Sequence, residues 1–308
     1  MAANLYTLQG KNKMKTWLLM SLFLVLVVAI GFFTSYYFDS PIILYIFIIF
    51  SIVTNIASYW FSDKIVLKIA KAKEAKKDQY YDLYTTVENL SITAGLPMPK
   101  VYVINDVSPN AFATGRDENH AAVAFTTGLL NLLDKPELEG VVAHELAHIG
   151  NRDILLQTVV VVLVGMIAMI ADFFLRITIY GGRNNDNKGG GLLIVLALFF
   201  VILSPIVASI LQLAISRKRE FLADATGAML TRYPEGLASA LIKIEGSAYE
   251  MKHVNHATAH MYISDPYSNL KDEKGHKKKV GFMTKIFRTH PPTVDRVKEL
   301  RGVSFSDK

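Results

Sequence analysis

Four long runs without a charged residue constrain the fold of this chain more than any other feature of its sequence. They are Trp17–Phe38, Pro41–Phe61, Ile154–Ala171 and Leu192–Ile215. An α-helix rises about 1.5 Å per residue and the hydrocarbon core of a bilayer is about 30 Å thick, so roughly 20 residues cross it. The first, second and fourth runs reach this length, and the third reaches it only marginally before Asp172. The sequence therefore predicts four transmembrane helices.

Lysine and arginine near the ends of these runs predict the orientation of the chain in the membrane. They precede the first run and follow the second and fourth, at Lys11, Lys13, Lys15, Lys64, Lys68, Lys71, Lys73, Lys76, Lys77, Arg217, Lys218 and Arg219. This bias favours both termini and the middle segment on the cytoplasmic side. A basic rim against anionic lipid also explains the formal net charge of +6, so no nucleic-acid partner is expected.

The segment between the second and third runs mixes helical and strand patterns. "VYVIND" (101–106) and "AAVAFTTG" (121–128) are rich in β-branched and aromatic residues, which predicts strands. Residues 65–93 have a helical pattern. Asp134 and Glu137 fit a capping box, so a further helix is expected to begin there. We therefore expect an α+β membrane protein, mostly helical, with a small β-sheet.

The stretch "AHELAHIGNRD" (143–153) lies on that helix and carries two histidines four residues apart. Residues with this spacing share one helix face, so His144 and His148 can bind one metal ion. Glu145 projects about 100° further round the helix, from where it can act as a general base without ligating the metal. Zinc accepts imidazole and carboxylate ligands, and this chain has no cysteine to offer a thiolate. The pattern is typical of an H-E-x-x-H zinc site, although a bare H-E-x-x-H also arises by chance.

A catalytic zinc site needs a third protein ligand, because three ligands and a water complete its coordination. Asn151 and Ile154 occupy the places where the longer zinc-protease motif has glycine and histidine, so a histidine there is excluded. The best candidate is Glu220 in "SRKREFLADA", on an expected helix after the fourth run. Asp224 lies one turn further along and can orient a ligand histidine. Alternatively, Glu220 is a charge at the membrane boundary that pairs with a neighbouring arginine.

Four separated motifs, "NAFATG", "AHELAHIGNRD", "REFLADA" and "THPPTVDR", together resemble the HtpX membrane heat-shock metalloproteases, which are relatives of the CAAX prenyl proteases. The resemblance extends over nearly the whole chain. It implies one zinc ion per chain with His144, His148 and Glu220 as ligands and Glu145 as the catalytic base. It also implies a thermolysin-like gluzincin core in a multi-pass protein of the bacterial inner membrane. The implied function is quality control under stress, by cleavage of misfolded or damaged membrane proteins at the cytoplasmic face, with self-cleavage.

These expectations divide the chain into four parts. Residues 1–61 form an N-terminal anchor hairpin of two transmembrane helices, and 62–153 form the first part of the catalytic domain. Residues 154–215 form a second transmembrane hairpin, and 216–308 complete the catalytic domain with the third zinc ligand. If the second hairpin returns to the membrane face where it began, both parts of the catalytic domain meet on that face.

The "NAFATG" motif supplies a candidate substrate site at Asn110, Ala111, Phe112 and Ala113. An exposed strand edge can pair with an extended peptide through the backbone, so the side chains of the substrate matter less. This suits an enzyme with many unfolded substrates. An ordinary hairpin turn would explain the same residues.

The "THPPTVDR" motif places a histidine and an arginine at the start of the expected C-terminal helix. Two prolines restrict the backbone after His290, which constrains the direction of its side chain. Because the resemblance places this motif beside the zinc, His290 and Arg296 are expected to stabilise the oxyanion or to hold the substrate carbonyl. The motif could instead be a local helix start whose arginine pairs with an acidic neighbour on the same helix.

Two other functions remain open on the sequence. The chain could be a non-catalytic zinc-binding membrane scaffold or chaperone, or a protease specific for prenylated proteins. Glu145 favours an enzyme over a scaffold, because a structural zinc site fills its fourth coordination position with a protein ligand and does not need a base there. Nothing in the sequence specifies a lipidated substrate.

Overall fold

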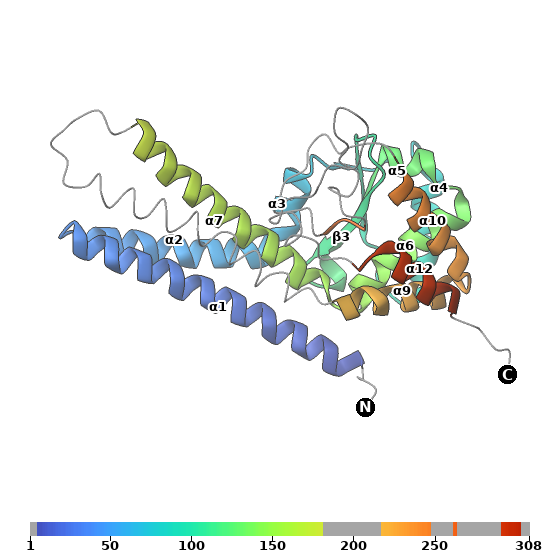
Figure 1. The fold of residues 1–308 in the computed structure, drawn as a ribbon, viewed down its shortest axis with the longest axis horizontal. Helices are drawn as coiled ribbons and strands as arrows, with labels where there is room; N and C mark the ends of the chain where they lie inside the picture. Colours follow the sequence, from blue (N-terminus) through green and yellow to red (C-terminus); the bar gives the residue numbers. More distant parts are fainter. Residues whose placement is uncertain (1–4, 181–216, 248–260, 264–290, 303–308) are drawn as a thin grey trace.

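The computed structural model describes residues 5–180, 217–247, 261–263 and 291–302 (Figure 1). Its elements are α1 (Leu5–Tyr37), α2 (Pro41–Trp60), α3 (Ser62–Ile69), β1 (Lys73–Glu74), α4 (Tyr81–Ala94), β2 (Lys100–Ile104), β3 (Ala111–Gly115), the 3-10 helix η1 (Glu118–His120), β4 (Ala121–Thr126), α5 (Thr127–Leu132), α6 (Lys135–Gly150), α7 (Ile154–Tyr180), α9 (Arg217–Thr231), α10 (Pro234–Gly246) and α12 (Thr293–Gly302). The protein is therefore mostly helical with one small sheet, as predicted.

Three long helices, α1, α2 and α7, lie together on one side of the molecule, and the sheet and shorter helices form the other side (Figure 1). Buried apolar side chains join α1 to α7, among them Phe23 and Val159. Within the described residues, Asn12–Tyr37 and Pro41–Trp60 are long and apolar enough to cross a membrane. The first two predicted spans are thus confirmed as helices of sufficient length.

The other two predicted spans have different outcomes. The third predicted run lies in α7. This helix counts toward a span only together with α6, and the two helices are bent by 84° at their junction. The described part of the chain therefore supplies two candidate spans, or three if this bent pair is included. The fourth predicted run, 192–215, lies outside the described residues, so four transmembrane helices remain a prediction.

The sheet has four strands in the order β1-β2-β4-β3. β2 and β4 are parallel, and they are the two strands that the sequence predicts. β3 pairs antiparallel with β4, with Ala113 opposite Val123, and is an outer strand of the sheet. The prediction of a single helix over residues 65–93 is wrong, because Lys71 has a positive φ of 53° and the chain then pairs with β2 as the short strand β1.

The main core lies between the sheet and the helices α4, α6, α10 and α12. α6 is at its centre, where Val141, Val142 and Leu146 have no exposed surface. The helix contacts α4, α9, α10 and β3. A helix that is packed on all sides holds its side chains in fixed directions, which suits it to present metal ligands.

Candidate metal centre and active site

α6 starts at a defined cap and carries both candidate histidine ligands. The Asp134 carboxylate accepts a hydrogen bond from the backbone N–H of Glu137, and the Glu137 carboxylate accepts one from the backbone N–H of Asp134. These contacts confirm the predicted capping box. The helix continues to Gly150, so His144 and His148 lie one turn apart on one face. Both imidazoles are buried, at 1% and 5% exposure.

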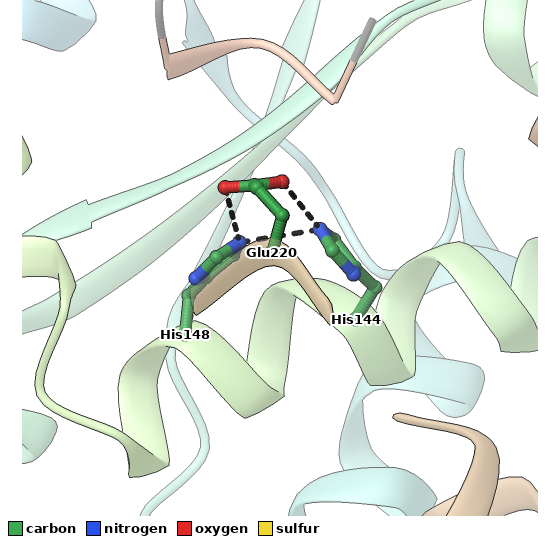
Figure 2. Close-up of side chains that lie close together, drawn as sticks. All are labelled: His144, His148 and Glu220. Carbon is green, nitrogen blue, oxygen red and sulfur yellow. Dashed lines mark hydrogen bonds and ion pairs between the residues drawn. The ribbon is translucent and has the colours of Figure 1, made fainter. Parts of the chain in front are cut away.

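Glu220, from α9, completes a three-residue cluster with these histidines (Figure 2). Its two carboxylate oxygens lie 3.8 Å from His144 Nε2 and 3.8 Å from His148 Nε2, and the two imidazole nitrogens are 3.2 Å apart. Donor atoms about 2.1 Å from a tetrahedral zinc ion are about 3.4 Å from one another. The three residues thus have both the donor chemistry and the spacing that one zinc ion requires.

The close approach of α9 to α6 depends on a glycine. A Cβ atom at Gly227 would lie 3.1 Å from the backbone nitrogen of His144 and 3.3 Å from the carbonyl carbon of Ala143. A larger residue would require the backbone of one helix to shift by a few tenths of an ångström. Because Gly227 lies about two turns after Glu220 on the same helix, this contact helps to hold the Glu220 carboxylate over the histidines.

Asp224, one turn after Glu220, lies between His144 and Arg296. Its Oδ1 is 3.0 Å from His144 Nδ1 and accepts a 2.6 Å hydrogen bond from Arg296 Nη2, while its Oδ2 accepts a 2.8 Å bond from Arg296 Nε. The contact with Nδ1 leaves Nε2 of the same imidazole directed toward Glu220 and His148. The Asp224 carboxylate is therefore in the position to orient a ligand histidine.

The charges around the cluster affect its ionisation states. Burial would raise the pKa of Asp224, but the charge and hydrogen bonds of Arg296 outweigh it and lower that pKa to about 2. Burial lowers the pKa of His144 to about 4, so this imidazole is neutral, as a metal ligand must be. Burial also acts to lower the pKa of His148, but the hydrogen bond to Asp153 and the charge of Glu220 raise it to about 9. A metal ion bound at His148 would displace this proton.

Arg296 extends from α12 into this cluster and is 1% exposed. Besides its two bonds to Asp224, its Nη1 donates to the backbone carbonyl of Ile263 at 3.1 Å. Burial alone would lower the pKa of Arg296, but Asp224, Glu220 and Glu145 together raise it. Its partner Asp224 lies 72 residues away in the sequence, and not on the same helix as the alternative interpretation supposed.

Glu145 lies between the two histidines on α6 and is 1% exposed. Its negative charge contributes to the raised pKa of His148 and to that of Arg296, so it lies close to the cluster. His290 lies outside the described residues. Its expected role, like the roles of Glu145 and Arg296, remains a prediction.

The strand edge at Asn110–Ala113 differs from the expectation in one respect. β3 is an outer strand, but the prediction that it is exposed is wrong for its side chains, since all four residues are buried. Phe112 packs edge-to-face against Tyr262 with 5.4 Å between ring centroids. The carbonyl of Ala111 accepts a hydrogen bond from the backbone N–H of Ile263 at 3.0 Å. Helices α6 and α7 also contact this strand, which accounts for its burial.

A second set of polar residues beside the cluster was not predicted from the sequence. Asp153, between α6 and α7, has its Oδ2 at 3.3 Å from His148 Nδ1. It therefore faces His148 in the same way that Asp224 faces His144. The sequence shows a carboxylate five residues after the second histidine, but not the turn at Arg152, whose φ is 57°, after which Asp153 lies beside His148.

Asn12 and Arg219 are two more buried polar residues near Asp153. The Asn12 amide donates to Asp153 Oδ1 at 2.7 Å and accepts from Arg219 Nη1 at 3.2 Å. Arg219 directly precedes Glu220 and opens the "REFLADA" motif, but nothing in the motif indicates its partners. Asn12 belongs to none of the four motifs, and its burial is not visible in the sequence.

The chain is similar to known proteins over most of its length. Residues 76–304 match the family described as Peptidase family M48. A protease HtpX homolog of Caldanaerobacter subterraneus subsp. tengcongensis is 43% identical over 307 residues, which cover 98% of each chain. One from Thermococcus kodakarensis is 43% identical over 293 residues, 94% of this chain and 96% of the relative. Among solved structures, that of S. mikatae Ste24p has a TM-score of 0.48 and 19% identity, over 93% of this chain and 67% of that one.

The family match covers most of the chain, and the HtpX homologs match it nearly end to end. The matched region contains both histidines, Glu145, Glu220 and Arg296. Two candidate membrane spans precede it. The chain therefore belongs to peptidase family M48, among the HtpX membrane metalloendopeptidases.

Proposed function

We propose that this protein is a zinc endopeptidase that cleaves misfolded or damaged membrane proteins at the cytoplasmic face of the membrane. The observation that carries the proposal is the buried cluster of His144, His148 and Glu220, with Glu145 on the same helix as the two histidines. The proposed ligands leave a fourth zinc position for water, as in a catalytic site.

The roles of the residues follow from their positions. When bound, zinc supplies a Lewis acid that polarises the scissile carbonyl and lowers the pKa of a water molecule. Glu145 takes a proton from the attacking water and delivers it to the leaving nitrogen. Asp224 and Asp153 each hold the Nδ1 side of one histidine, so that both Nε2 atoms are directed toward the metal position.

The proposed substrate site is the edge of β3 at Asn110–Ala113. The backbone hydrogen bond from Ile263 to Ala111 supports it, because it joins this strand to a further backbone segment. Arg296 Nη1 already donates to one backbone carbonyl, that of Ile263, beside the same edge. This is the kind of contact that we propose for the substrate carbonyl, with His290 as a second donor.

The cytoplasmic position of the site rests on the basic flanks of the first span and on one contact. Asn12 begins that span and donates a hydrogen bond to Asp153, so the metal cluster lies close to the end of α1 at which the span begins. The charge bias places this end in the cytoplasm. The division into an anchor hairpin (1–61), two catalytic parts (62–153 and 216–308) and a second hairpin (154–215) is part of the same proposal.

A proteolysis assay with the full chain in detergent tests the proposal. A destabilised membrane protein and its stable parent serve as substrates, with added zinc, with chelator, and with Glu145→Gln. We expect cleavage of the destabilised substrate only with zinc and with Glu145 intact. Fragments of the enzyme itself should also form in the wild type and be absent in the variant.

Other results would favour the alternatives. Zinc bound at one ion per chain without any cleavage would support a scaffold. Cleavage of a farnesylated peptide together with failure to cleave its unprenylated form and the destabilised substrate would support a prenyl-protein protease. Unchanged turnover by Glu145→Gln would refute its role as the base.

A further inference from the structure

Asn12 connects the first membrane helix to the metal cluster. It lies in α1 where the candidate span Asn12–Tyr37 begins, and it is only 6% exposed. Its amide nitrogen donates to Asp153 Oδ1 at 2.7 Å, and its amide oxygen accepts from Arg219 Nη1 at 3.2 Å. An amide side chain suits this place because it offers both donors and an acceptor.

Asp153 transmits this contact to His148. Its Oδ1 faces Asn12 and also lies 3.7 Å from Arg219 Nη1, whereas its Oδ2 lies 3.3 Å from His148 Nδ1. The two oxygens thus have different partners. Rotation of this buried carboxylate would break the hydrogen bond from Asn12 and move Oδ1 away from the Arg219 guanidinium, so the direction of the other oxygen depends on α1 and α9.

The contacts join three separate parts of the fold at one point. Asn12 is on the first membrane helix, Asp153 is at the bend between α6 and α7, and Arg219 directly precedes Glu220 on α9. Two of the three proposed zinc ligands are therefore linked to α1. His148 is linked through Asp153, and Glu220 is linked through Arg219, its neighbour in the chain.

We propose that Asn12 is a positioning residue of the metal site, through which the placement of the first membrane helix sets the orientation of His148 and the affinity for zinc. The inference rests on the zinc site proposed above. The competing interpretation is that Asn12 only docks α1, like the apolar residues that pack the same helix against α7. Met20 is such a residue, since it is buried in the cluster between these helices and lies about two turns along α1 from Asn12.

The experiment compares Asn12→Leu with Met20→Ala in the full chain in detergent. Leucine has the branching and the number of side-chain heavy atoms of asparagine and favours a helix, so Asn12→Leu removes the polar contacts while it keeps the site filled. Zinc affinity is measured by competition with a chromophoric chelator. The visible absorption spectrum of the cobalt(II)-substituted protein reports the ligand geometry, and the apparent Tm reports the docking of α1.

Asn12→Leu should weaken zinc binding by about 10-fold, the lower end of the range for residues that orient a metal ligand, and should shift the cobalt spectrum. Met20→Ala should lower the apparent Tm but leave zinc affinity and the spectrum unchanged. Wild-type affinity and spectrum in Asn12→Leu would overturn the inference, as would an equal loss of affinity in Met20→Ala. His148→Ala tests the metal site separately: if it retained zinc with full affinity, the ligand assignment itself would fail.

Discussion

The pairing of Arg296 with Asp224 allows a prediction with an internal control on the same helix. α12 carries two arginines that each make two bonds to a carboxylate, Arg296 to Asp224 and Arg301 to Glu235. The first pair is buried, at 2% and 3% side-chain exposure, and the second is about half exposed, at 53% and 44%. The two ion pairs have similar geometry but differ in exposure, so a comparison of their variants isolates the effect of burial.

Replacement of Arg296 by methionine should strongly destabilise the fold, because it leaves the Asp224 carboxylate buried without its main partner. Breaking a buried ion pair by removing one member typically costs about 3–5 kcal/mol. At about 2–4 °C per kcal/mol for a domain of this size, this corresponds to a fall of roughly 6–20 °C in Tm. The contact of Asp224 with His144 places the expected value toward the lower end.

The assay is thermal unfolding in detergent, followed by intrinsic fluorescence and carried out with chelator present so that zinc does not contribute. Arg301→Met is the matched control and should cause a much smaller shift, since water screens the exposed pair. The double variant Arg296→Met with Asp224→Leu should recover much of the lost Tm, because it removes both buried charges. Equal shifts for Arg296→Met and Arg301→Met would refute the reasoning.

Four further predictions follow from the site. Glu220→Ala should lose most of its zinc, measured by metal analysis after gel filtration, and retention of one ion per chain would remove Glu220 from the ligand set. Asp153→Asn should weaken zinc binding by about 10–100-fold in chelator competition, because His148 loses its carboxylate partner. Gly227→Val should lower zinc affinity by forcing α9 away from α6, whereas Gly246→Val, where an added Cβ would meet nothing within 4 Å, should not. A single cysteine that replaces Asn89 in this cysteine-free chain should not be labelled by a membrane-impermeant thiol reagent added to intact cells, because we propose that this segment lies in the cytoplasm. Labelling there would contradict the proposed topology.

The sequence was most informative where a feature depends on neighbouring residues. The capping box of Asp134 and Glu137 and the shared face of His144 and His148 both arise within a few helical turns, so spacing alone predicts them. The length of the first two candidate spans is likewise a property of continuous segments. Glu220 was also identified as a candidate, because its helix follows the fourth apolar run, which was expected to return the chain toward the histidines.

Features that depend on distant segments required the tertiary structure. The break in residues 65–93 occurs because β1 finds a partner in β2, and local helical propensity does not report such pairing. The same limit applies to β3, whose side chains are buried by α6 and α7 although its motif is typical of an exposed edge.

The surroundings of the metal cluster show this division most clearly. The sequence determined which residues can bind a metal, since a histidine pair and a carboxylate have that chemistry wherever they lie. Only the fold decided what holds them in place, because Arg296 meets Asp224 across 72 positions and Asn12 meets Asp153 across 141. No periodicity extends over such distances, and these contacts form only when packing brings buried polar groups together and each group must find a hydrogen-bond partner.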